Sequence, residues 1–296
     1  MDLFGNEIVI TQTLADKYLM CPTTVLNSRD PKWKELKAKW NNLGIKSEVG
    51  RENIKKNNAN DFSRMKKYSE NKKGVTSYIS FNETNSTTSI FDPVICEIIY
   101  KWFAKCNILD PFAGGSVRGI VANKLGFKYT GIELRREQVE SNREQALNIL
   151  EVNNQPQWYL GDSEVVLDEL IPKYDLLFSC PPYMDLEIYS DLENDLSNMT
   201  DENFTTKYEI IIKKSCDKLI NGGYAVFVVG DLRDKKGYLK DFTGITKEAF
   251  KKCGMKLYNE LILVTPVGSK AMTLETGFKK GKLARVHQNI YIFVKP

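Results

Sequence analysis

Three acidic residues follow successive apolar runs of the chain, where strands would end: Asp110 after NIL, Glu133 after YTGI and Asp162 after YLG. A glycine-bearing turn, residues 113–115, follows the first acid and leads into a helical segment. Glycine allows close backbone approach to a ligand, and a helix start offers free N–H groups. An acid about 20 residues after such a turn can accept ribose hydroxyls, and the third acid could receive an adenine amino group. Each acid alone is more often a helix cap or loop residue, but three in register predict a nucleotide-type pocket.

A second motif, residues 175–189, reads DLLFSCPPYMDLEIY. An apolar strand runs directly into Pro181, Pro182 and Tyr183. Prolines stiffen the backbone and lack N–H groups, so the carbonyls before them are held in place. These carbonyls can accept the protons of an amino group while the aromatic ring stacks on a planar base. A Pro-Pro-Tyr alone is also typical of loops and peptide ligands, but its place after a core strand favours a base-amine site.

The elements that must position these residues alternate from about residue 89 onward. Apolar runs that end near residues 110, 133, 160, 179 and 229 are separated by segments of helical periodicity. Such alternation predicts an α/β fold with a mostly parallel sheet. Two last runs, about 257–265 and 289–295, have no helical pattern between them and predict an antiparallel pair that closes the sheet edge. The first turn lacks G-x-G-x-x-G, which disfavours a nicotinamide dehydrogenase.

The N-terminal part has two features outside this pattern. Trp33 and Trp40 lie in PKWKELKAKWNNLGI, which predicts an amphipathic helix. It would dock its tryptophans on the main domain, or turn its lysines toward a polyanion. Residues 46–73 are rich in Lys, Asn, Ser and Glu. They are either a solvated linker or a basic strap that orders along phosphates.

The segment 265–288, between the last two strands, is a candidate nucleic-acid contact. It is either an ordinary exposed hairpin loop or a loop over the site that holds phosphates. Its basic residues are Lys270, Lys279, Lys280, Lys282 and Arg285. His287, the only histidine, is either a structural residue or a residue that shapes the pocket.

Bulk composition bounds the function only weakly. The net charge is +4, from 42 basic and 38 acidic residues, so any basic surface must come from uneven distribution. The sequence has no apolar run long enough for a membrane helix and no signal-peptide pattern. Six scattered cysteines fit a reduced cytoplasmic protein, and a single histidine disfavours a metal site.

The set DPFAGG, GIEL, GDS and SCPPY resembles the DNA amino-methyltransferases, the N6-adenine and N4-cytosine class, over roughly residues 89–296. The N-terminal stretch is similar to phage- or prophage-borne DNA methylases. The resemblance implies a Rossmann-like class I methyltransferase fold over 76–296, with a seven-stranded sheet and an antiparallel C-terminal strand, after an extension over 1–75. It also implies S-adenosylmethionine as cofactor. The implied cofactor-binding residues are Phe91, Asp110, Pro111, Phe112, Ala113, Gly114, Gly115, Glu133, Leu134, Asp162 and Ser163.

The implied catalytic residues are Ser179, Cys180, Pro181, Pro182 and Tyr183. The family usually has Asp, Asn or Ser where this chain has Cys180, and a thiol is a weak acceptor. Ser179, or an acid of the following loop (Asp185 or Glu187), is then the expected substitute. The expected partner is double-stranded DNA with the target base flipped out, in a bacterial or phage-infected cell, as part of restriction and modification. Alternatives are an RNA or protein-glutamine methyltransferase and a non-catalytic nucleic-acid-binding protein.

Overall fold

The computed structural model describes residues 13–46, 49–50, 55–56, 91–171, 174–184, 187–234, 236–268, 271 and 274–296, with the backbone alone at 55–56 and 187–188. The described residues form an eight-stranded sheet in the order β1-β9-β10-β8-β6-β3-β4-β5 and a two-stranded sheet, β2-β7. The bounds are β1 Val25–Asn27, β3 Asn107–Asp110, β4 Lys128–Glu133, β5 Gln157–Leu160, β6 Tyr174–Ser179, β8 Leu219–Val229, β9 Lys256–Val264 and β10 His287–Val294. The short pair is β2 Lys55–Lys56 and β7 Glu187–Ile188.

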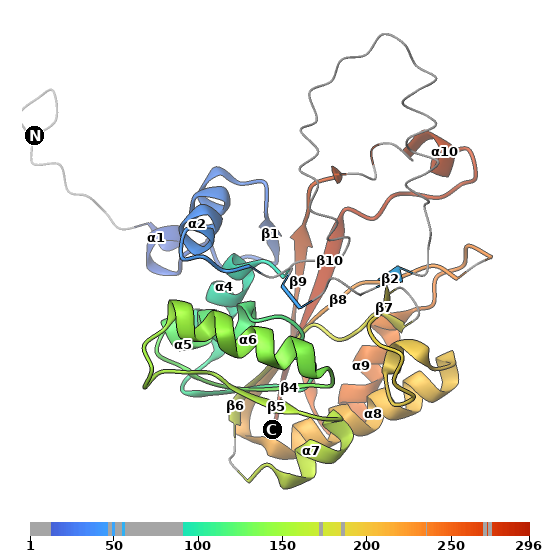
Figure 1. The fold of residues 1–296 in the computed structure, drawn as a ribbon. Coiled ribbons are helices and arrows are strands. Elements are labelled where there is room, and N and C mark those ends of the chain that lie inside the picture. The colour runs from blue at the N-terminus through green and yellow to red at the C-terminus, as the bar shows by residue number, and fades with distance from the viewer. Residues whose placement is uncertain are drawn as a thin grey trace, which may run out of the picture.

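Helices cover both faces of the large sheet (Figure 1). On one side lie α4 Pro93–Phe103, α5 Val117–Lys124 and α6 Arg136–Ile149, and on the other α7 Ser163–Glu169, α8 Asp201–Lys218 and α9 Phe242–Lys252. The remaining helices are α1 Leu14–Lys17, α2 Pro31–Asn41, the 3-10 helix η2 Leu196–Asn198 and α10 Leu274–Phe278. This is the layered arrangement that alternating strands and helices produce.

Alternate residues of each central strand supply two separate hydrophobic cores. In β6, Leu176 and Phe178 face the core shared with α4 and α5, whereas Leu177 faces the core shared with α8 and α9. Successive side chains of a strand point to opposite faces, so a strand with helices on both sides must be apolar throughout. All six residues of β6 are buried, which explains the apolar run Leu176–Phe178 at its centre.

The strand order confirms the predicted fold. Strands β3, β4, β5, β6 and β8 are parallel, and β10 is antiparallel to both β8 and β9. The chain leaves β3 toward β4 and β5, and then returns to β6 on the other side of β3. The carboxyl ends of β3 and β6 therefore flank the switch point, where open α/β sheets bind ligands. This is the Rossmann-like order of the class I methyltransferase fold.

The N-terminal segment is part of this body. Its strand β1 pairs in parallel with Ile262–Val264 of β9 and forms the sheet edge, so the sheet has one strand more than the seven expected. Helix α2 packs on α4, where the indole of Trp33 donates to Asp92 at 3.2 Å and that of Trp40 donates to Glu97 at 2.6 Å. Both tryptophans are buried, which confirms the docking alternative for this helix.

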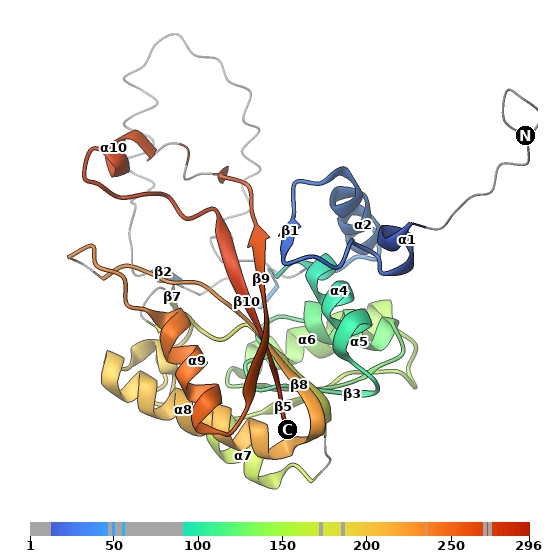
Figure 2. The ribbon, with the colours of Figure 1, turned by 180° about the vertical axis from the view of Figure 1, so that it is seen from behind.

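The antiparallel pair predicted at the end of the chain is present as β9 and β10. Strand β10 lies inside the sheet, between β8 and β9, and not at its edge. The connection between them contains α10, which Figure 2 shows beyond the end of the β9–β10 hairpin and away from the helical layers. The connection therefore lies at the edge of the sheet where β8 has its carboxyl end, because β10 runs antiparallel to β8.

Candidate active site

A cavity of about 630 Å³ opens at the carboxyl ends of the parallel strands. It joins the two sequence motifs, because the turn after β3 and the Pro-Pro-Tyr segment after β6 line the same space. The predicted residues that line it are Phe91, Pro111, Phe112, Gly114, Glu133, Leu134, Asp162, Ser163, Cys180, Pro181, Pro182, Tyr183, Arg285 and His287. Asp110, Ala113, Gly115 and Ser179 are not among the lining residues.

Asp110 lies beneath the cavity and binds the two motifs together. Its carboxylate is fully buried and accepts hydrogen bonds from the Nε of Arg118, the hydroxyl of Tyr129 at 2.7 Å and the hydroxyl of Ser179 at 2.5 Å. It also accepts from the backbone N–H of Phe112 at 3.1 Å. A buried carboxylate needs such partners. Asp110 therefore positions the cofactor turn relative to the end of β6.

Ser179 does not have the expected role of a substitute for the weak acceptor Cys180. Its side chain is fully buried, and its hydroxyl donates to Asp110. The other expected substitutes are an acid at position 185, which lies outside the described residues, and Glu187, of which only the backbone is described. Ser179 thus holds the end of β6 in place from inside the core.

Arg118, on the helix after the turn, is a site residue that sequence reasoning missed. Its Nη2 donates to the carbonyls of Phe112 at 2.6 Å and Ala113 at 2.8 Å, and its guanidinium lies 4.7 Å from the ring centre of Phe91. Burial is the largest single influence and opposes its charge, but Asp110, Tyr129 and Cys180 together outweigh burial and raise the pKa of Arg118. The only sequence signal was a cation within the first turn of the helix after GGS.

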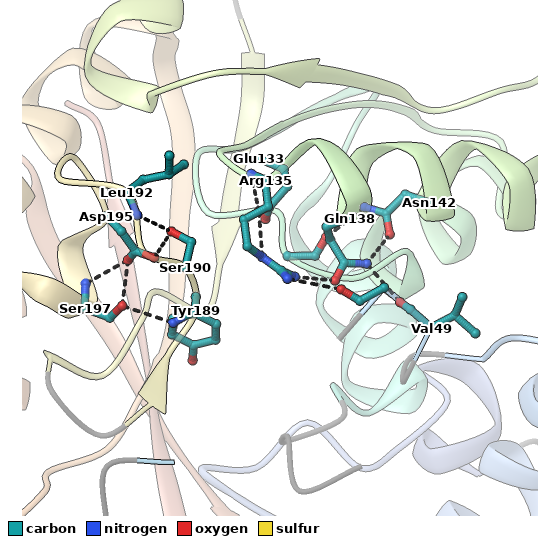
Figure 3. A network of polar contacts seen from close by, with 12 residues as sticks. Val49, Glu133, Arg135, Gln138, Asn142, Tyr189, Ser190, Leu192, Asp195 and Ser197 are labelled. Atoms are coloured by element: carbon teal, nitrogen blue, oxygen red, sulfur yellow. Dashed lines mark hydrogen bonds and ion pairs between the residues drawn. The ribbon is translucent and has the colours of Figure 1, made fainter. Parts of the chain in front are cut away.

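Glu133 lines the cavity at the end of β4, as predicted for a ribose-binding acid. Its Oε1 accepts from the backbone N–H of Arg135 at 2.9 Å and lies 3.7 Å from the Nε of the same residue. Arg135 also lines the cavity, and its Nη1 donates to the carbonyl of Gly50 at 3.1 Å. An N-terminal residue thus reaches the edge of the predicted cofactor pocket (Figure 3).

A relay of side-chain amides extends this contact to the glycine turn (Figure 3). The amide of Gln138 donates to the carbonyl of Val49 at 3.2 Å and to Asn142 Oδ1 at 2.9 Å, and Asn142 donates to the carbonyl of Gly114 at 2.8 Å. Gly50 has a φ of +81°, and a Cβ there would lie 2.8 Å from the Oγ of Ser141. Glycine is therefore required at position 50 for this close passage.

Asp162, the third predicted acid, caps helix α7 as well as lining the cavity. Its Oδ1 accepts from the N–H of Glu164 at 3.0 Å, while its Oδ2 accepts from Lys207 at 2.5 Å and from Asn194 at 3.1 Å. A carboxylate offers about four acceptor positions, so one remains for an amino group. Ser163 beside it donates to the carbonyl of Pro111 at 2.5 Å, which ties α7 to the turn after β3.

The Pro-Pro-Tyr segment forms the opposite wall. The ring of Tyr183 packs edge-on against Phe242, with centroids 5.8 Å apart, and its hydroxyl accepts from Gln288 at 3.1 Å. The thiol of Cys180 lies 3.8 Å from the same hydroxyl, and burial raises the pKa of Tyr183 well above its usual value. Met184 follows with a φ of +46°. A left-handed conformation at a non-glycine residue costs about 1–2 kcal/mol and is typical of functional turns.

The loop after this segment completes the wall. Asp195 is buried and accepts from the hydroxyls of Ser190 at 2.7 Å and Ser197 at 2.8 Å, and the Ser197 hydroxyl accepts from the N–H of Tyr189 at 3.2 Å. Figure 3 shows this network across the site from Arg135. Tyr189 and Leu196 line the cavity, so residues 189–198 are part of the site.

A further acid that sequence reasoning missed closes the cavity at the end of β8. Asp231 lines the cavity and pairs with Arg285, from Oδ2 to Nη2, at 3.0 Å. The signal was available in VVGD, since this acid follows a strand-like run as the three predicted acids do. Arg285 therefore lies inside the cavity, apart from the lysines with which it was grouped.

Those lysines lie elsewhere. Lys279 and Lys280, just after α10, are exposed, and Lys282 is half-buried. Lys279 pairs with Glu275 at 2.6 Å. Lys270 lies outside the described residues, as does most of the segment 46–73. Within the described part of the chain, no helix is both long and apolar enough to cross a lipid bilayer.

No protein-family model matches the sequence, and no curated protein matches it. Solved structures similar to the chain include TrmN from Thermus thermophilus (14% identity, TM-score 0.48) and TehB from Haemophilus influenzae (16%, 0.45). These likenesses cover 70% and 71% of this chain, but only 49% of TrmN and 64% of TehB. Magnesium protoporphyrin IX methyltransferase from Synechocystis with bound SAM has 12% identity and a TM-score of 0.43, over 69% of this chain and 79% of that one. Likenesses this distant indicate no substrate.

Proposed function

We propose that the protein is an S-adenosylmethionine-dependent methyltransferase that modifies an exocyclic amine of a base in DNA, N6 of adenine or N4 of cytosine. The observation that carries the proposal is the shared cavity. The cofactor-type turn at Phe112 and Gly114 and the amine-type segment at Pro181–Tyr183 line one space of about 630 Å³. Methyl transfer requires the two reactants in contact, and this arrangement brings both binding elements together.

The residues on one side of the cavity fit S-adenosylmethionine. The acids Glu133 and Asp162 follow adjacent parallel strands, where ribose and adenine groups can be received. Gly114, with a φ of +53°, leaves the backbone open beside them, and Phe112 and Leu134 supply apolar contacts. The cofactor supplies a methyl group that is already activated as a sulfonium. The protein therefore has to bind and orient the amine.

The chain performs this task at the end of β6. The rings of Pro181 and Pro182 fix the backbone φ, so the carbonyls of this segment have a set direction in which to accept from an amino group. Two such bonds draw the nitrogen lone pair away from conjugation with the ring, which favours the transition state over the bound substrate. Tyr183, held by Phe242 and Gln288, offers a fixed ring face for the base.

Nucleic acid as the substrate accounts for the surroundings of the cavity. A base inside a duplex cannot reach a cavity of this kind and must flip out, at a cost of a few kcal/mol. The exposed cations of Lys279 and Lys280, and the half-buried Lys282, stand on the connection that leads into the cavity through Arg285. Cations at such a place can hold phosphates next to a flipped base.

Methyl transfer from labelled S-adenosylmethionine tests the proposal. The full chain is incubated with unmethylated genomic DNA, total RNA or a protein mixture, and the products are digested and analysed by mass spectrometry. We expect N6-methyladenine or N4-methylcytosine in DNA, and neither with Tyr183→Ala. Label in RNA or in glutamine with none in DNA would overturn the proposed substrate. A protein that does not bind S-adenosylmethionine in calorimetry would overturn the enzyme assignment.

A further inference from the structure

The cavity has a second polar end, opposite the cofactor-type acids. Asp231 follows β8, Arg285 precedes β10, and both line the cavity with the Pro-Pro-Tyr segment. A Cβ built on Gly230 would lie 3.8 Å from Nη1 of Arg285 and 3.8 Å from Cε1 of Tyr183. The guanidinium and the ring therefore flank the same point. A base that stacks on Tyr183 would present its edge to Arg285.

Arg285 is held in a defined orientation. Its Nη2 donates to Asp231 Oδ2 at 3.0 Å, and its Nη1 lies 3.5 Å from Asn289 Oδ1. Asp231 is itself fixed, because its Oδ1 accepts from both the N–H and the hydroxyl of Thr243 at 3.0 Å. These contacts fix the plane of the guanidinium, whose donors form a rigid planar fork.

The same contacts argue against a phosphate as the partner of Arg285. Asp231 is a carboxylate next to the guanidinium, so its charge would repel a phosphate while it offsets the charge of the arginine. A neutral base edge meets no such repulsion. Lys279 and Lys280 are the better phosphate ligands, because they are exposed and stand outside the cavity.

The chemistry of base edges then favours one base. Arginine has N–H donors and no acceptor. In cytosine the amine is followed around the ring by two consecutive acceptors, N3 and the carbonyl oxygen O2. In adenine the amine is followed by N1 and then by a C–H group. A fork of donors beside an amine-binding segment can therefore bind two acceptors of cytosine, N3 and O2, but only one acceptor of adenine, N1.

From this match we propose that Arg285, oriented by Asp231, selects cytosine as the target base, so that the product is N4-methylcytosine. The proposal rests on the proposed function and makes it specific. Arg285 acts here as a specificity-determining residue, and Asp231 as its positioning residue. A purely structural role, joining β8 to the start of β10, would not impose a preference between bases.

The test compares base products and cofactor binding in the same proteins. Unmethylated genomic DNA of mixed sequence is methylated by the full chain, and both methylated nucleosides are quantified. We expect N4-methylcytosine as the main product. Arg285→Met should lower the rate of cytosine methylation at least about tenfold, as expected for the loss of a bidentate contact to a base. Arg285→Lys should not restore it, because a point charge lacks the fork.

Two controls separate this outcome from misfolding and from loss of the proposed function. Lys213→Met also removes a cation, but from the exposed pair with Asp217 on α8, outside the cavity, and should keep the rate and the base product unchanged. Binding of S-adenosylmethionine by calorimetry should be the same in all variants, which shows that they fold. N6-methyladenine as the main product, or equal losses in Arg285→Met and Lys213→Met, would overturn the inference and leave the proposed function standing. No methylated base in DNA from the wild type would overturn the proposed substrate itself.

Discussion

The side-chain amide of Gln288 donates a 3.1 Å hydrogen bond to the phenol oxygen of Tyr183, across 105 positions of sequence. Gln288 belongs to β10, the antiparallel strand, whereas Tyr183 follows β6. The two strands are separated by β8 in the sheet. The bond therefore fixes the ring of Tyr183 against the far side of the cavity, and the position of the ring does not depend on its own loop alone.

Substitution of Tyr183 should separate binding from transfer. Tyr183→Ala removes the stacking surface for the base but leaves the residues around Glu133 intact, so methyl transfer should be lost while S-adenosylmethionine still binds. Stacking of a base on an aromatic ring contributes about 1–3 kcal/mol. Transfer is measured with labelled cofactor and binding by calorimetry. Tyr183→Phe is the matched control, since it keeps the ring and should keep most activity.

Pro182→Ala tests the stiffness of the same segment. The new residue restores a backbone N–H and frees φ, so the neighbouring carbonyls lose their fixed direction. We expect transfer to fall strongly, again with cofactor binding retained. Normal turnover by both Pro182→Ala and Tyr183→Ala would refute the assignment of this segment to the amine.

Glu133→Ala should weaken the affinity for S-adenosylmethionine. The carboxylate lines the cavity after β4, and its hydrogen bonds to a ligand would be charge-assisted, worth about 1.5–3 kcal/mol each. A loss of tenfold or more is therefore expected, at about 1.4 kcal/mol per factor of ten. Titration calorimetry measures it. Glu137→Ala removes an exposed acid from the next helix and should leave the affinity unchanged.

Arg118→Met should destabilise the whole protein. Arg118 and Asp110 form a buried ion pair, and removal of one partner leaves a buried charge, at a cost of about 3–5 kcal/mol. Urea unfolding followed by circular dichroism measures the change. The exposed pair of Lys213 and Asp217 offers a control, since Lys213→Met should hardly move the midpoint. A midpoint that Arg118→Met leaves unchanged would contradict a stabilising role for this buried pair.

Stability should fall in alkaline solution because of buried tyrosines. Burial raises the pKa values of Tyr100, Tyr129, Tyr183 and Tyr208. The folded protein thus keeps these protons at a pH where the unfolded chain releases them. Their contribution is complete below a pH of about 10 and is lost as pH rises above it. The midpoint of urea unfolding should drop between about pH 9 and 11, together with the appearance of tyrosinate absorbance. The Tyr129→Phe protein should show a smaller drop.

Sequence patterns predicted those parts of the site that depend on local order. The periodicity of the strands, the glycine turn and the acids at strand ends placed Glu133 and Asp162 correctly on one cavity with Tyr183. They did so because the carboxyl ends of parallel strands meet at one edge of a sheet. Asp231 also follows a strand-like run, so the same rule could have predicted its place in the site.

Roles that depend on tertiary partners were beyond the sequence. Nothing local shows that Ser179 donates to Asp110, or that Arg118 turns back onto the carbonyls before its own helix. The contact of Arg135 with Gly50 joins segments 85 positions apart. Strand β1 has three residues, too few to show a periodicity of two. Its pairing is specified by β9 and by the two tryptophans that anchor the following helix.

The position of β1 has a consequence for any shortened form of the protein. Strand β1 pairs with Ile262–Val264 and so forms hydrogen bonds with backbone groups that would otherwise be unpaired along the edge of the sheet. Loss of the first 75 residues would bare this margin and, in addition, the apolar flank of α4 beneath Trp33 and Trp40. Bare strand margins recruit other chains. A fragment that lacks the first 75 residues would therefore tend to self-associate and precipitate, although it would retain every cavity residue after position 90.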